Sequence, residues 1–238
     1  MADKWLSLSW VVNDQKEPLQ VYRGQHGGTS HDPAAVRLQS ALASITFTPN
    51  PAVASTYAMK PNDWRLAPIA PCVIPAYLDI RQPIFWLEDD PFVDFSELSL
   101  ALGADTALRF ARKFSSHVED TNMWADELSS LFNSVDDFLN KHPERVNELY
   151  VQAWVLLDDF AFVQVAKDAG FDGAMSLGSG ASALIAEYRI FDTAQYKPAV
   201  EWQAAVDKRV DLLTQSHREN MEAKQAAFED DLQRELHG

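Results

Sequence analysis

The chain has 238 residues, of which 47% are hydrophobic and 23% charged, and Cys72 is its one cysteine. This composition is typical of a globular protein with a sizeable core, and it excludes an intramolecular disulfide and a zinc site built on several cysteines. The 20 basic and 35 acidic residues give a net charge of −15, which disfavours nucleic acid as a sequence-independent ligand.

Strand signals in the first third of the chain alternate with turn residues. Segments rich in β-branched and aromatic residues are expected as strands over 19–23, 44–48 and 72–80. Pro75 indicates that the third strand lies at an edge or carries a bulge. Asn50 is a suitable N-cap for a helix that begins at Pro51 and continues to about 59. The intervening segments predict a glycine-rich loop over 24–32 and a short helix over 36–43.

From Asp94 onward the apolar residues repeat with the period of an α-helix. Asp94 and Glu97 have the spacing of a capping box, for a helix that continues towards Lys113. Further helices are expected over 123–139, 143–156 and 158–169, with Gly170 as a left-handed stop. Strands are expected again over 171–175 and 184–191, and the tail is expected to form an amphipathic helix.

These elements predict an α+β fold with one domain over 1–200, a helical block over about 90–169 inside it, and a C-terminal amphipathic helix over 201–238. The block is acidic, because residues 81–160 hold six basic and 16 acidic side chains, whereas residues 1–80 hold six of each. Solvated helical faces are the simplest interpretation, and a docking surface for a basic partner is the alternative. No signal peptide or membrane span is recognisable, so we expect a cytoplasmic protein.

Three segments carry the functional prediction: VYRG at 21–24, TFTPNP at 46–51 with the helix that follows, and AGFDGAMSLGSGASALIAEYRIFD at 169–192 before QYKP. In residue type, order and expected structure this set resembles the ADP-ribosyltransferase family, in particular the bacterial and phage-associated members found in MuF-like and polyvalent proteins. The resemblance implies an ADP-ribosyltransferase-like split antiparallel β-sandwich with a helical insertion. In that family two small sheets form a cleft for bent NAD+.

The family's triad of Arg, Ser/Thr-x-Ser/Thr and Glu corresponds here to Arg23, to Thr46 with Thr48, and to Glu187. By this resemblance Glu187 is the catalytic carboxylate, which stabilises the oxocarbenium cation that develops when nicotinamide leaves. Arg23 would bind the NAD+ phosphates through its planar fork, and the Thr46 hydroxyl would fix the rotamer of Glu187.

The resemblance adds further candidates for binding NAD+. Gly24 would let the backbone meet the nicotinamide amide without a Cβ in the way, and Phe47 and Tyr57 could pack against the nicotinamide ring. The loop 177–184 corresponds to the family's target-recognition turn and offers little side-chain chemistry of its own. Ile185 stands where arginine-directed members carry Glu or Gln, which leaves the acceptor open.

Plainer interpretations of the same residues exist. Glu187 and Arg189 point to one face of a strand, so an ion pair between them is the alternative to a catalytic role. Arg23 at a strand end could pair with a surface carboxylate, and Tyr57 could be a core residue. The ordered set as a whole favours the functional interpretation over each of these.

The sequence therefore predicts a mono-ADP-ribosyltransferase that uses NAD+ as a substrate, contains no metal, releases nicotinamide and modifies an unidentified acceptor. The negative charge favours a protein acceptor over nucleic acid, and no membrane partner is expected. Two alternatives stay open. One is a catalytically inactive ADP-ribosyltransferase-fold binding or virion-associated module, and the other is an NAD+ glycohydrolase that transfers ADP-ribose to water.

Overall fold

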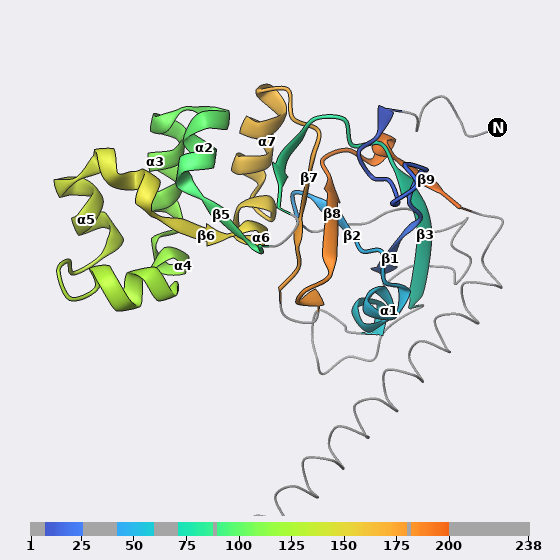
Figure 1. Ribbon diagram of the computed structural model, residues 1–238, viewed down its shortest axis with the longest axis horizontal. Coiled ribbons are helices and arrows are strands. Elements are labelled where there is room, and N and C mark those ends of the chain that lie inside the picture. The colour runs from blue at the N-terminus through green and yellow to red at the C-terminus, as the bar shows by residue number, and fades with distance from the viewer. Residues whose placement is uncertain (1–7, 26–41, 60–70, 88–89, 180–181, 200–238) are drawn as a thin grey trace, which may run out of the picture.

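The computed structural model describes residues 8–25, 42–59, 71–87, 90–179 and 182–199. Within them the chain is a mixed fold of α-helices and several β-sheets, with strands gathered on one side and most helices on the other (Figure 1). The predicted tail helix, the glycine-rich loop and most of the helix predicted over 36–43 lie outside these residues. No helix in the described ranges is long and apolar enough to cross a membrane.

Two sheets form the strand side. The first is antiparallel, with the order β1–β3–β9, and consists of β1 (Val21–Gln25), β3 (Cys72–Leu78) and β9 (Tyr196–Pro198), the last preceded by the short 3₁₀ helix η5 (Thr193–Gln195). The second has the order β2–β8–β7–β4 and consists of β2 (Ile45–Phe47), β8 (Ala186–Ile190), β7 (Gly173–Leu177) and β4 (Pro83–Trp86). Because β4 and β7 are parallel, the expectation of a wholly antiparallel sandwich is wrong at that edge.

Strand β3 lies in the centre of its sheet, so the edge position predicted from Pro75 is wrong. Pro75 is paired with Tyr22 of β1, but the backbone groups of these two residues point away from each other. Tyr22 exchanges hydrogen bonds of 2.7 and 2.9 Å with Thr48, and the Pro75 carbonyl accepts from the Ala199 N–H at 2.8 Å. The missing N–H of proline therefore removes no hydrogen bond to β1.

Apolar side chains of the two sheets pack against each other. They form one core cluster with members from β1, β2, β3 and β8 and from neighbouring segments: Val11, Val21, Ile45, Phe47, Ala76, Leu78, Ile80, Tyr188 and Ile190. Because side chains alternate along a strand, Thr46, Glu187 and Arg189 lie on the opposite face of β2 and β8. The same alternation that builds the core thus gathers polar side chains on the other face of the second sheet.

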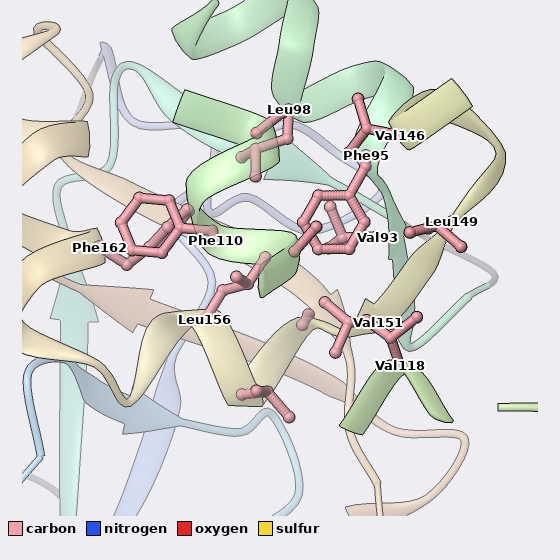
Figure 2. Close-up of a cluster of buried hydrophobic side chains, with 14 of the residues drawn as sticks. Val93, Phe95, Leu98, Phe110, Val118, Val146, Leu149, Val151, Leu156 and Phe162 are labelled. Atoms are coloured by element: carbon pink, nitrogen blue, oxygen red, sulfur yellow. The ribbon is translucent and has the colours of Figure 1, made fainter. Parts of the chain in front are cut away.

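The segment between β4 and β7 forms the helical side. Its helices are α2 (Phe95–Leu102), α3 (Ala104–Lys113), α4 (Ser115–Glu119), the π-helix η2 (Trp124–Leu128), α5 (Val135–Lys141), the 3₁₀ helix η3 (Pro143–Glu148), α6 (Ala153–Leu157) and α7 (Phe160–Asp168). A two-stranded sheet of β5 (Phe92–Asp94) and β6 (Tyr150–Gln152) lies among them, where the sequence predicted helix or no element. Figure 2 shows the core of this block. The rings of Phe110 and Phe162 pack edge to face there, with their centroids 5.1 Å apart.

The helix ends observed in this block agree only in part with those predicted from the sequence. The helix predicted from Asp94 to Lys113 is interrupted at Gly103, whose φ of 88° separates α2 from α3. Asp94 ends β5 and its side chain makes no capping hydrogen bond, so the predicted capping box is wrong. Gly170, with a φ of 93°, follows the end of α7 as expected.

Helix α1 (Pro51–Met59) packs on β1 and β3 (Figure 1). The Asn50 side-chain oxygen accepts hydrogen bonds of 2.9 and 3.3 Å from two N–H groups in the first turn, which confirms the predicted cap. Gly24 lies directly against the helix, because a Cβ there would be 1.7 Å from the Ala54 carbonyl oxygen and 2.6 Å from the Ala58 nitrogen. Only glycine allows this close packing.

Gly24→Ala should destabilise the fold by about 3 kcal/mol, because the atoms that the new methyl group meets belong to helix backbone and cannot rotate away. Gly170→Ala is a matched control, since its Cβ would meet nothing within 4 Å and the cost is limited to its left-handed φ, about 1–2 kcal/mol. Urea unfolding of both variants measures the difference. A Gly24→Ala protein as stable as the wild type would contradict the packing described for α1.

Candidate functional site

Strands β1 and β2 meet at one point and then separate. The meeting point is the pair of backbone hydrogen bonds between Tyr22 and Thr48. Continued antiparallel pairing would set Gly24 opposite Thr46, but among the described residues the bridge between these segments is the Tyr22–Thr48 pair. The Thr46 carbonyl oxygen accepts a hydrogen bond from Arg23 Nη1 at 3.0 Å. A guanidinium therefore bonds the carbonyl at which the backbone ladder between the two strands would have continued.

The electrostatic surroundings of Arg23 are unfavourable for its charge. Burial and the nearby positive charge of Arg189 lower the pKa of Arg23 from the ordinary arginine range to about 10, while Cys72 acts in the opposite direction. Arg23 still carries its proton at neutral pH. Two guanidinium groups, one from each sheet, thus lie close enough to repel each other.

Glu187 of β8 is 6% exposed, and both of its carboxylate oxygens accept hydrogen bonds within the protein. Ser182 Oγ lies 2.5 Å from Oε1, and Arg189 donates to Oε2 from Nε at 3.3 Å and from Nη2 at 3.1 Å. The ion pair that the sequence left as an alternative is therefore present. A carboxylate has about four lone-pair positions, so these bonds leave Glu187 capacity for a further donor.

Ser182 links helix α1 to Glu187. The Tyr57 hydroxyl is 3.3 Å from Ser182 Oγ, and Tyr57 itself is 40% exposed. Gly178 makes the approach of Ser182 feasible, because a Cβ at Gly178 would lie 2.3 Å from Ser182 Oγ. The loop that was expected to offer little side-chain chemistry thus supplies a hydroxyl to the candidate catalytic carboxylate.

The two threonines predicted for the site take different places. Thr46 lies opposite Arg189 on the polar face of the sheet. Among the described residues no hydrogen bond joins its hydroxyl to Glu187, and the bonds that hold this carboxylate come from Ser182 and Arg189. Thr48 is buried, and its Oγ1 accepts from the N–H of Asn50 at 3.3 Å, which closes the turn into α1.

Phe47 lies in the core between the sheets rather than beside Glu187. It is 1% exposed and stacks on Tyr196 with ring centroids 6.3 Å apart. Since neighbouring residues of β2 face opposite sides, Phe47 points away from the face that carries Thr46. In this structure Phe47 therefore has no surface to offer to a nicotinamide ring, and its position is explained by packing.

Sequence reasoning missed the contacts that connect β8 to the helical block. Arg189 Nη1 donates to Asp158 Oδ1 at 2.5 Å and to Ser44 Oγ at 3.3 Å. The proximity of Glu187 and Arg189 could be inferred from their spacing of two residues. Nothing in the local sequence connects either of them with Asp158, which precedes Arg189 by 31 residues.

No protein-family model, curated protein or solved structure matches this chain. The candidate site is therefore defined by the arrangement of its residues. Three residues that are far apart in the sequence, Arg23, Thr46 and Glu187, come together around Arg189. Arg189 lies opposite Thr46, contacts Glu187 and, together with burial, lowers the pKa of Arg23. Tyr57 joins this group through Ser182, whereas Gly24, Phe47 and Thr48 have packing or turn roles.

The lowered pKa of Arg23 predicts how this residue affects stability. The folded state disfavours the protonated form of Arg23 relative to the unfolded chain, so the charged side chain destabilises the fold below pH 10. This effect fades as the pH rises further, towards the ordinary arginine range. Arg23→Met should therefore be at least as stable as the wild type at pH 8, with a gain of up to about 2 kcal/mol after loss of the bond to Thr46. The gain should shrink near pH 11.

Denaturant unfolding at the two pH values measures this difference. Arg109→Met removes a positive charge from an exposed position and controls for the general effect on a protein of net charge −15. If Arg23→Met lost several kcal/mol at pH 8, the guanidinium would be a stabilising part of the fold and the prediction would be wrong.

Proposed function

We propose that the protein is a mono-ADP-ribosyltransferase that cleaves NAD+ and transfers ADP-ribose to an acceptor. The observation that carries the proposal is the buried Glu187 carboxylate, held by Ser182 on one oxygen and by Arg189 on the other, on the sheet face that also carries Thr46. The separation of the two sheets beyond Tyr22 and Thr48 supports an ADP-ribosyltransferase-like split sandwich as the finer description of the fold.

In the proposed reaction the bond between the ribose C1′ atom and the nicotinamide nitrogen breaks. The electron pair leaves with nicotinamide, which becomes neutral, and an oxocarbenium cation develops on the ribose. A nucleophilic atom of the acceptor then bonds to C1′ and loses its proton. A fixed carboxylate near the ribose stabilises charge that appears in the transition state only, which is the interaction that accelerates such a step.

The residues divide this work between them. Glu187 would face the ribose and its developing cation, and the bonds from Ser182 and Arg189 would hold the carboxylate in one rotamer before the substrate arrives. Arg23, which the resemblance assigns to the NAD+ phosphates, lies beside Thr46 at the junction of the sheets. A planar guanidinium suits phosphate oxygens because it donates in two parallel directions.

The acceptor is proposed to be a protein group other than an arginine side chain. Ile185, at the position where arginine-directed members carry Glu or Gln, has no side-chain acceptor for a guanidinium. Its carbonyl accepts from the Gly178 N–H at 2.9 Å, which fixes the backbone of this turn. The exposed residue nearest to it in the chain, Leu184, is apolar and 85% exposed, so the surface there favours an apolar or neutral neighbourhood around the acceptor.

The second candidate function is a binding module of the same fold without turnover. It is favoured by the burial of Glu187 and by the engagement of both its oxygens within the protein, since a carboxylate satisfied in this way could be purely structural. The two functions differ in one measurable product, because a binding module releases no nicotinamide.

Glu187→Gln keeps the shape of the side chain and removes its charge, and we expect it to lower the rate of nicotinamide release from NAD+ at least a hundredfold. Glu148→Gln is the matched control, because Glu148 is an exposed residue of η3 that pairs with Arg145. Release is measured by chromatography with equal amounts of folded protein. Full activity of Glu187→Gln would remove the basis of the proposal, and an inactive wild type would favour the binding module.

Incubation of the wild type with NAD+ labelled in its adenylate part, in a cell lysate, identifies the acceptor class. Label on protein is the expected result. Label on nucleic acid would contradict the proposed acceptor, and free ADP-ribose alone would identify a glycohydrolase. Treatment of the labelled protein with hydroxylamine or with mercuric ion then distinguishes carboxylate and cysteine linkages from the others. The treatment that releases the label indicates which kind of side chain is modified.

A further inference from the structure

We propose that Arg189 is a positioning residue for Glu187 and that Asp158 holds Arg189 in place, so that the helical block supplies part of the site. This inference rests on the proposed function, because it assigns a role in that reaction to two residues outside the triad. Neither Arg189 nor Asp158 would touch NAD+. Both would act through the carboxylate of Glu187.

The guanidinium of Arg189 uses its three nitrogens in two directions. Nε and Nη2 donate to Glu187, and Nη1 donates to Asp158 and Ser44. Arg189 is 5% exposed, so it has no solvent to replace a lost partner. Because the planar guanidinium of Arg189 is hydrogen-bonded on two edges, its orientation is fixed. The carboxylate of Glu187, which it contacts, is therefore restrained as well.

Asp158 is itself fixed by the helical block. It is the C-terminal cap of α6, and its backbone N–H donates to the Trp154 carbonyl at 2.9 Å. Leu156 and Leu157, immediately before it, are 0% exposed, and Leu156 belongs to the core shown in Figure 2. The position of Asp158 is therefore determined by a packed core that is separate from the core between the two sheets.

Ser182 restrains the other oxygen of Glu187 from the opposite side. The carboxylate is consequently held between a loop that reaches α1 and a guanidinium that reaches α6. Reaction rates depend steeply on such placement, and a displacement of about 1 Å can cost about a hundredfold. Weakening the Arg189 restraint should therefore lower kcat without weakening the binding of NAD+.

Asp158→Asn keeps the shape of the side chain and removes the charge that holds Arg189, and Arg189→Lys keeps a positive charge but lacks the fork. We expect both to lower kcat for nicotinamide release about tenfold or more, with the KM for NAD+ within about twofold of the wild type. Asp159→Asn is the matched control, because it changes the adjacent carboxylate, which contacts Lys113 and not Arg189, and asparagine still caps α7. Its kcat should stay at the wild-type value.

A double-mutant comparison separates positioning from general support of the fold. If Asp158 acts through Glu187, the double variant Asp158→Asn with Glu187→Gln should have the same kcat as Glu187→Gln alone, within about twofold. Rates are referred to folded protein, measured by circular dichroism and thermal unfolding. Asp158→Asn provides the answer if Arg189→Lys does not fold.

Three results would overturn the inference. Wild-type kcat in both Asp158→Asn and Arg189→Lys would show that the restraint has no effect while leaving the proposed function intact. Losses that multiply in the Glu187→Gln background, or that appear in KM alone, would show that Asp158 does not act through Glu187. A wild-type protein that releases no nicotinamide would remove the proposed function and this inference with it.

Discussion

The junction of β1 and β2 is the constraint on which the arrangement of this protein depends. In the described residues, β1 is joined to the end of β2 by one pair of backbone hydrogen bonds, between Tyr22 and Thr48, the residue that follows β2. Elsewhere β1 pairs with β3, and β2 pairs with β8. Beyond Tyr22 and Thr48, α1 packs closely on the face of β1 at Gly24, where a Cβ would meet helix backbone. Buried carbonyl groups need donors, and the Thr46 carbonyl receives one from the Arg23 side chain. The guanidinium of Arg23 thus lies where the two sheets separate, and its hydrogen bond satisfies a backbone carbonyl there.

Three charged groups on and beside β8 depend on one another, and the guanidinium of Arg23 lies near them. Arg189 is bonded to both Glu187 and Asp158, and its positive charge contributes to the lowered pKa of Arg23. An isolated buried charge costs several kcal/mol, and removal of one partner exposes the rest to that cost. The ion pair between Glu187 and Arg189 is therefore compatible with both proposed functions. In the proposed transferase, the pair would hold the carboxylate in place before the substrate binds.

The sequence predicts those parts of the structure whose causes are local. Asn50 and Pro51 are enough to begin α1, and the β-branched segments around Thr46 and Glu187 are found as strands. The order of the three motifs also indicates which strands carry the site. Ser182 and Asp158 could not be assigned, because their contacts with β8 arise from a loop that returns beside Gly178 and from a helix packed in another core. Thr46, the predicted hydroxyl donor, lies on the predicted strand and on the same sheet face as Glu187. The hydroxyl hydrogen bond to Glu187 nevertheless comes from Ser182.

The carboxylates of the acidic helical block differ in how exposed their basic partners are. Asp137, Glu148 and Asp159 pair with lysine or arginine side chains that are 37–54% exposed, and such pairs contribute little because water competes for them. They fit the interpretation of the block as solvated helical faces.

Asp158 differs because its partner, Arg189, is buried on β8 of the second sheet. The charge excess of the block is thus mainly a surface property. Among the described residues of the block, Asp158 is the carboxylate that connects its core to the strand that carries Glu187. Under the proposed function, this contact would let the helical segment between β4 and β7 contribute to the placement of Glu187.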